Sequence, residues 1–223
     1  STGFKDVGYL QLATTERRDE AYRRETAYMR SIGMEKQILS PKEILDIVPM
    51  MKVDDVIHGF WTPDEGRANP VDVTMSLAKG AKQKGVRIFE ETEVTGFDVS
   101  DGRIRGVQTE RGTVECEKVV LAAGLWGREL AARAGVLVPL QAAEHYYLLT
   151  EPIEGVTPEN VPVIEDPEAY GYYREEGGGL LVGMFEPVGA AWSLDGTPKD
   201  SAFAVLPPDW DRLGPFLEKA MQR

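Results

Sequence analysis

The first candidate for chemistry is a turn of small residues, Ala122-Ala123-Gly124, at the end of an apolar run. The run from 118 to 123 is typical of a parallel strand that is buried on both faces. Because the turn carries no bulky side chain, its backbone can come close to a flat or phosphorylated ligand. The residues alone are equally compatible with a tight connection between this strand and a helix over 129–134 that binds nothing.

The composition limits the classes of function that remain. The chain has 223 residues, 42% of them hydrophobic and 28% charged, as in a globular protein of one or two domains. Its formal net charge of −12 argues against a partner that is a nucleic acid, because the phosphates would be repelled. The single cysteine, Cys116, excludes an internal disulfide and a multi-cysteine metal site, so we predict no metal. No apolar run approaches the roughly 20 residues of a membrane span, and the first residues do not resemble a secretion signal.

Local patterns predict the elements that come before this turn. Ser40-Pro41-Lys42-Glu43 is a capping box with proline at the first helical position, and Pro49 ends the helix it starts. Asn69 before Pro70 marks a longer helix that Gly85 closes. The predicted elements are a strand over 8–13, a helix from Thr15 to Gly33, a short helix up to 48, a strand over 56–61 and a helix from 70 to about 84.

The middle of the chain reads as strands that lead into the turn. Two hairpin turns, Ser100-Asp101-Gly102 and Glu110-Arg111-Gly112, separate alternating segments and predict an antiparallel meander. A helix, a strand, a meander and a strand ending in Ala-Ala-Gly is the order found in the second half of flavin- or nicotinamide-binding domains. The predicted strands are 86–90, 93–99, 103–109 and 113–116, then 144–150, 169–174 and 180–185, before a loop over 189–200 and a helix capped by Asp209.

The phosphate-binding part of such a domain is not found in the sequence. No G-x-G-x-x-G follows a predicted strand, and Gly177-Gly178-Gly179 with Gly183 lies in a hairpin at the wrong spacing. The first strand–turn–helix unit is also missing. We therefore expect the chain to be an interior piece of a longer protein.

Several stretches, spread over nearly the whole chain, form a family pattern when they are taken in order. They are Trp61-Thr-Pro-Asp-Glu-Gly66, Glu93-Val94, Val119-Val-Leu-Ala-Ala-Gly-Leu-Trp-Gly127, Glu144-His-Tyr-Tyr-Leu-Leu-Thr-Glu-Pro152 and Tyr172-Tyr-Arg-Glu-Glu-Gly-Gly-Gly-Leu-Leu-Val-Gly183. In this order they resemble FAD-dependent amine oxidoreductases of the D-amino-acid-oxidase superfamily, and within it the sarcosine and dimethylglycine dehydrogenases. The family's N-terminal glycine motif, the histidine that often carries covalent flavin and the C-terminal flavin-ring segment have no counterpart here.

The resemblance implies an α/β fold in which a partial FAD-binding domain is interleaved with a substrate domain, itself an antiparallel sheet backed by helices (α+β). It places residues 1–60 and 135–223 on the substrate side and 61–134 on the FAD side. FAD is then the cofactor of the parent enzyme, and we do not expect this chain alone to retain it. We expect Glu93, Val94 and the turn to face one crevice. The implied cofactor contacts are Glu93, Val94, Ala122, Ala123, Gly124, Trp126 and Gly127.

The implied reaction is hydride transfer from an N-methyl carbon of a small amino acid to the flavin. Arg174 would bind the substrate carboxylate, although pairing with Glu175 or Glu176 explains it equally well. Tyr147 would hold the amine or accept its proton, and Tyr173 would line the site, although core packing explains both tyrosines as well. We expect Arg174 and Tyr147 to point toward the flavin ring.

Other substrates and a role without catalysis remain open. Glycine or a D-amino acid would use the same chemistry, whereas glycerol 3-phosphate is disfavoured because Arg174 is the only arginine between Arg133 and Arg212. The chain is alternatively a module that keeps the fold and has lost the flavin site. Folate would be a partner only through domains that this chain lacks. The resemblance implies the cytoplasm of a bacterium or the mitochondrial matrix of a eukaryote, and no secretion.

Overall fold

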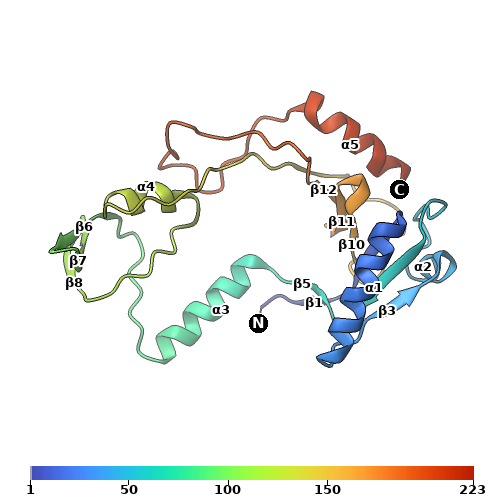
Figure 1. Cartoon of the computed structure of the whole chain (residues 1–223), viewed down its shortest axis with the longest axis horizontal. Helices are drawn as coiled ribbons and strands as arrows, with labels where there is room; N and C mark the ends of the chain where they lie inside the picture. Colours follow the sequence, from blue (N-terminus) through green and yellow to red (C-terminus); the bar gives the residue numbers. More distant parts are fainter. Residues whose placement is uncertain (1) are drawn as a thin grey trace. The chain divides into compact units, whose positions relative to one another are not determined.

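The computed structural model describes residues 2–223 and divides into two compact units. The first unit contains the chain up to Lys79, His145–Val188 and Pro208–Arg223, and the second contains Gly80–Glu144 and Gly189–Pro207. In Figure 1 the blue start of the chain, the orange strands labelled β10, β11 and β12 and the red helix labelled α5 all belong to the first unit. The roles predicted for 1–60, 61–134 and 135–223 stay predictions, and residue 1 lies outside the described residues.

Within the described residues, a seven-stranded sheet forms the centre of the first unit. Every neighbouring pair is antiparallel except β2 and β10, which are parallel, so the predicted antiparallel sheet is in fact mixed. A separate pair joins β1 (Lys5–Asp6) to β5 (Gly66–Arg67). The order in the large sheet is β3 (Gln37–Leu39), β4 (His58–Thr62), β2 (Tyr9–Ala13), β10 (Val163–Asp166), β11 (Gly171–Glu176), β12 (Gly179–Met184) and β9 (Tyr147–Leu149).

Four helices begin where the sequence predicts, whereas the helix predicted over 129–134 begins earlier, at Gly127. The side chains of Thr15, Ser40 and Asp209 accept backbone N–H groups at the starts of α1 (Glu16–Ser31), α2 (Pro41–Ile47) and α5 (Trp210–Gln222). Asn69 does the same for α3 (Pro70–Gln83), and a 3-10 turn, η2 (Pro167–Ala169), follows β10. No helix of residues 2–223 has the length and apolar character to cross a membrane.

The two faces of the large sheet differ because successive residues of a strand point to opposite sides. One face, which we call the core face, carries Leu10, Ile164 and Tyr173 and packs with Ile44 of α2 and Leu217 of α5. On the other face, α1 packs over β2 and β4. There Tyr22 packs on Phe60 with 5.3 Å between ring centroids. Over β11, β12 and β9 this second face, the open face, carries the exposed Tyr147.

The predicted meander is confirmed in the second unit. β6 (Val94–Ser100), β7 (Arg103–Thr109) and β8 (Gly112–Glu115) pair in order as antiparallel neighbours. Asp101 and Gly102 both have positive φ at the first hairpin turn, a conformation that aspartate and glycine tolerate. The chain continues to a 3-10 turn, η1 (Gly124–Trp126), and α4 (Gly127–Ala132).

Two predicted strands are wrong. Residues 118–123 and 86–90 are not strands, and Val120 is 90% exposed instead of buried. A strand needs a neighbour that completes its backbone hydrogen bonds, and no strand among residues 2–223 pairs with either segment. The sequence patterns also missed β1, β3, β5 and β10, which are two to four residues long. The mixture of α/β and α+β structure is nevertheless confirmed.

Candidate functional site

The open face of the sheet places several candidate side chains in one row. Tyr147 of β9 lies opposite Gly183 of β12, and Gly183 lies opposite Tyr172 of β11. Residues that pair in this way point to the same face, so the two tyrosines share the open face. The ring of Tyr172 lies over Gly183, because a Cβ added at that glycine would collide with the ring. Glycine at 183 is therefore required by the position of Tyr172.

An aromatic cluster surrounds Tyr172 at this end of the sheet. The ring of His145 is nearly parallel to that of Tyr172, with 6.3 Å between centroids and 7° between planes. Phe185 packs against both, at 4.8 Å from His145 and 5.3 Å from Tyr172, and is itself 64% exposed. The His145 Nε2 and Tyr172 Oη atoms are 3.4 Å apart. The two polar groups can therefore exchange a proton through a hydrogen bond beside an exposed apolar ring.

The electrostatic surroundings keep the phenol of Tyr172 neutral. Burial raises its pKa, the positive charge of Arg174 opposes the rise, and Tyr147 adds to it. A neutral phenol can donate one hydrogen bond and accept others. Tyr172 can thus donate or accept a hydrogen bond without carrying charge.

Arg174 lies on the same open face, two residues beyond Tyr172. Its Nη1 is 2.5 Å from Oε2 of Glu176, and its side chain is 31% exposed. Arg174 therefore pairs with Glu176, as the alternative interpretation of the sequence allowed. Glu175 pairs with Arg67 instead. Glu176 leaves the remaining guanidinium donors of Arg174 for a second carboxylate.

Tyr173 is not brought together with Arg174 and Tyr147. Its side chain is 6% exposed and belongs to the core face of the sheet. Burial, and then the charge of Asp166, raises the pKa of Tyr173 to about 12. The residue that the sequence analysis missed is Tyr172. Strict alternation along β11 was the available signal, because it puts residue 172 and not residue 173 on the face of residue 174.

In the second unit, the turn Ala122-Ala123-Gly124 lines an apolar hollow of about 540 Å³. Its other walls include Phe97 and Ile104 of the meander, and no charged side chain lines it. A Cβ added at Gly124 would meet nothing within 4 Å, and Gly124 has a φ of +51°. The hollow therefore offers apolar walls to a ring of a cofactor such as FAD and no cation to its phosphates.

Of the other residues predicted for the cofactor, Gly127 alone lines this hollow. Glu93 is exposed, and Lys199, which hydrogen-bonds it at 2.7 Å, lowers its pKa. Trp126 donates from Nε1 to the carbonyl of Pro198 at 2.9 Å. Val94 begins β6, and Gly127 begins α4 within the hollow's lining. Glu93 and Trp126 thus contact two consecutive residues, Lys199 and Pro198, whereas the shared crevice of Glu93, Val94 and the turn stays a prediction.

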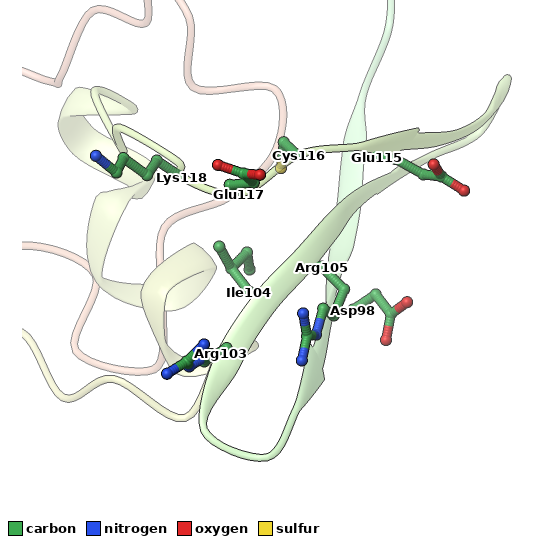
Figure 2. Close-up of a pocket in the computed structure, with 8 residues that line it drawn as sticks. All are labelled: Asp98, Arg103, Ile104, Arg105, Glu115, Cys116, Glu117 and Lys118. Atoms are coloured by element: carbon green, nitrogen blue, oxygen red, sulfur yellow. The ribbon is translucent and has the colours of Figure 1, made fainter.

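A second hollow in this unit has a charged lining. It measures about 890 Å³ and lies along the meander, as Figure 2 shows. Asp98, Glu115 and Glu117 face Arg103, Arg105 and Lys118, so the charges balance and select no class of ligand. Among the described residues, no group of three or more histidine, cysteine or acidic side chains could hold a metal ion.

Comparison with known proteins identifies the kind of chain this is. The family model described as FAD dependent oxidoreductase matches residues 1–223. Human mitochondrial sarcosine dehydrogenase is 33% identical over all of this chain and 24% of its own length. A formaldehyde-forming 4-methylaminobutanoate oxidase of Paenarthrobacter nicotinovorans is 37% identical over 97% of this chain and 26% of its own. The chain spans about a quarter of the length of these curated relatives.

A further relative and a solved structure complete the comparison. The mitochondrial pyruvate dehydrogenase phosphatase regulatory subunit of the mouse is 32% identical over the whole chain and 25% of its own length. The crystal structure of L-proline dehydrogenase from P. horikoshii superposes with a TM-score of 0.79 and 25% identity, over 98% of this chain and 56% of that one.

Proposed function

The chain belongs to the family of FAD-dependent oxidoreductases, and from that premise we propose that the full-length protein oxidises an N-methyl group of a small amino acid such as sarcosine or dimethylglycine. The open face, where Tyr172, His145 and Arg174 lie together, is the observation that carries the proposal. Relatives named sarcosine dehydrogenase, dimethylglycine dehydrogenase and 4-methylaminobutanoate oxidase, at 30–37% identity, support this substrate class. FAD, when bound, supplies the hydride acceptor.

Arg174 binds the carboxylate of the substrate in this proposal. A guanidinium matches a carboxylate with two parallel hydrogen bonds, which fixes the orientation of the rest of the molecule. Glu176 already holds one edge of Arg174 at 2.5 Å, and this contact restricts the rotamers of the arginine. The substrate therefore meets a cation that is already oriented.

Tyr172 and His145 act on the amine. The substrate must be a neutral amine before it can lose hydride, so a proton has to leave its nitrogen. Tyr172 accepts a hydrogen bond from the ammonium, and His145, with its Nε2 at 3.4 Å from Tyr172 Oη, takes up the proton. The exposed ring of Phe185 and the ring of Tyr147 give the N-methyl group an apolar wall.

The experiment is expression of the full-length protein followed by an assay for bound flavin and for reduction of that flavin by each substrate, with formaldehyde release measured as well for the two N-methyl amino acids. The substrates are sarcosine, dimethylglycine, glycine and glycerol 3-phosphate. We expect flavin absorbance and the highest kcat/KM with an N-methyl amino acid. A higher kcat/KM with glycine or glycerol 3-phosphate would reject the proposed substrate class.

A matched pair of variants tests the role of the phenol. Tyr172→Phe should lower kcat by about 10²-fold, because acid–base catalysis contributes about that much, and should change the pH profile of kcat. Tyr28→Phe is the control, since Tyr28 lies on α1 and is 63% exposed. Equal kinetics of the two variants would remove Tyr172 from the site.

A second candidate function is a flavoprotein-like module without catalysis. It is favoured by the mouse relative, whose name describes a regulatory subunit and which matches the whole chain. Flavin-free full-length protein that turns over none of the four substrates would support this candidate. A folate partner would depend on domains outside these 223 residues and stays a prediction.

A further inference from the structure

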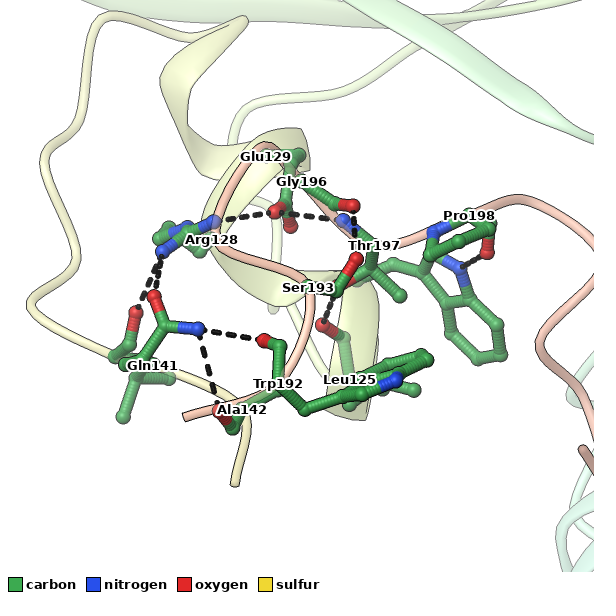
Figure 3. A network of polar contacts seen from close by, with 12 residues as sticks. Leu125, Arg128, Glu129, Gln141, Ala142, Trp192, Ser193, Gly196, Thr197 and Pro198 are labelled. Atoms are coloured by element: carbon green, nitrogen blue, oxygen red, sulfur yellow. Dashed lines mark hydrogen bonds and ion pairs between the residues drawn. The ribbon is translucent and has the colours of Figure 1, made fainter. Parts of the chain in front are cut away.

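The segment Trp192–Lys199, which we call the strap, lies against residues 125–129, directly after the turn Ala122-Ala123-Gly124. The backbone N–H of Thr197 donates to Glu129 Oε1 at 3.2 Å, and its hydroxyl donates to the carbonyl of Leu125 at 3.2 Å. Trp126 donates to the carbonyl of the strap residue Pro198 (Figure 3). The strap therefore contacts two consecutive elements, η1 through Leu125 and Trp126 and the first turn of α4 through Glu129.

Both ends of the strap are also fixed. At one end the N–H of Trp192 donates to the carbonyl of Ala142 at 2.8 Å, and Gln141 Nε2 donates to the carbonyl of Trp192 at 2.7 Å (Figure 3). At the other end Lys199 Nζ donates to Glu93 Oε1 at 2.7 Å. The strap thus connects the two segments that were predicted to contact FAD.

The strap has a shape that presents Thr197 to Glu129. Gly196 has a φ of +116°, a backbone conformation that other residues avoid, and the hydroxyl of Ser193 donates to its carbonyl. A Cβ at Gly196 would lie 3.7 Å from Glu129 Oε1. A cavity of about 210 Å³ remains between the strap and the turn, so polar contacts and not close packing hold the two together.

Glu129 is the polar centre of these contacts. Its Oε1 accepts from Thr197 and from Arg128 Nη2, at 3.2 and 3.0 Å, whereas its buried Oε2 hydrogen-bonds none of residues 2–223. The pKa of Glu129 is lowered by a backbone N–H of its own residue, against the effect of burial, and further by Thr197 and Arg128. The carboxylate is therefore ionised at neutral pH.

We propose that Glu129 is a positioning residue for the cofactor: it fastens the strap, and the strap in turn holds the backbone of the turn at 122–127 in the conformation that receives the flavin nucleotide. The proposal rests on the FAD part of the proposed function and not on its substrate. It also moves Gly189–Lys199 from the substrate side, where the sequence places it, to the cofactor side.

The test compares Glu129→Ala with Glu110→Ala in the full-length protein. Glu110 is the matched control, because it is an exposed glutamate in the turn between β7 and β8 of the same unit. Hydrogen–deuterium exchange without FAD should show faster exchange at 192–199 and 122–128 in Glu129→Ala alone. A fluorescence titration should show that its dissociation constant for FAD rises about tenfold or more, as the loss of a charged hydrogen bond predicts. Glu129→Gln keeps the shape of the side chain and one acceptor. Its exchange rates and its dissociation constant for FAD should therefore lie between those of Glu129→Ala and the wild type.

Several results would overturn the proposal. Unchanged exchange in Glu129→Ala shows that the carboxylate does not fasten the strap, and faster exchange with wild-type FAD affinity shows that the strap does not serve the cofactor. If Glu129→Ala does not fold, Glu129→Gln takes its place in the exchange test of the carboxylate. Thr197→Val, which removes only the bond to Leu125, then tests whether a loosened strap weakens FAD binding, and faster exchange in it with wild-type FAD affinity overturns the proposal. A wild-type protein that binds FAD but oxidises no N-methyl amino acid defeats the proposed function alone. A wild-type protein without FAD affinity defeats both.

Discussion

Replacement of Arg174 by alanine in the full-length protein is the sharpest test of the open face as a substrate site. The change removes a guanidinium that is 31% exposed and leaves the strand β11 intact. A hydrogen bond to a charged group contributes about 1.5–3 kcal/mol. At about 1.4 kcal/mol per tenfold change, kcat/KM for sarcosine or dimethylglycine should fall between about 10-fold and 150-fold. Most of the loss should appear in KM, because the carboxylate is bound equally in the ground state and in the transition state.

The structure predicts little effect of this change on stability. The ion pair with Glu176 is partly exposed on both sides, at 31% and 44%, and such pairs contribute at most about 1 kcal/mol. The melting temperature should therefore stay close to that of the wild type, and a kinetic loss reports on binding. Glu176→Gln is the companion variant, since it keeps the side chain's shape and removes the charge that competes with the substrate carboxylate.

The assay compares an acid with an amine that lacks the carboxylate. Steady-state kinetics with dimethylglycine and with dimethylamine give the contribution of the carboxylate as a ratio of kcat/KM values. In the wild type this ratio should favour dimethylglycine, and in Arg174→Ala the preference should disappear. An equal fall for both substrates, or no fall for either, would refute the reasoning.

Other predictions concern stability, pH and cofactor retention. Arg67→Ala removes the partner of Glu175, which is 2% exposed, so the free energy of unfolding in urea should fall by about 3 kcal/mol; a loss below about 1 kcal/mol would contradict the burial of this pair. Tyr173→Phe removes a hydroxyl that hydrogen-bonds no described residue, so kcat/KM should stay at the wild-type value. Because the pKa of Tyr173 is raised from 10.0 to about 12, its contribution to stability is complete below pH 10 and disappears as the pH rises to about 12. Circular dichroism should therefore show less alkaline unfolding in Tyr173→Phe, and identical curves would be evidence against this raised pKa. Titration of the 223-residue chain with FAD should give no saturable micromolar binding, because its sequence has no glycine-rich phosphate turn after a strand.

The helix starts and the meander were predictable because their interactions are local. Ser40 and Glu43 hydrogen-bond each other's backbone within three residues, so the sequence contains both partners of the cap. The hairpin at Asp101 and Gly102 likewise depends on the backbone freedom of two adjacent residues. The family resemblance could also be recognised from the sequence, because it consists of short motifs in a fixed order.

The candidate site was predictable only in part. Arg174 and Tyr147 were selected from the sequence, and the structure places both on one face of the sheet. Tyr172 was missed because two adjacent tyrosines do not show which of them points to that face until the register of β11 is known. The strap was read as a plain loop, since its partners lie about 50 to 106 residues away in the sequence.

What the sequence determined by itself is the set of local elements, the family and the residue types available for chemistry. The tertiary structure decided which strands pair: β2 and β10 lie side by side although about 150 residues separate them. It also decided burial, as for Lys36, which is 2% exposed in a polar stretch because Gln11 and Glu25 accept its hydrogen bonds. Residues 119–121 show the opposite case, since this apolar segment is exposed and forms no strand. An apolar segment becomes a strand only where a neighbouring strand completes its backbone hydrogen bonds. Local patterns can be read from the chain because both partners are close in sequence, whereas pairing and burial depend on partners that only the folded chain brings together.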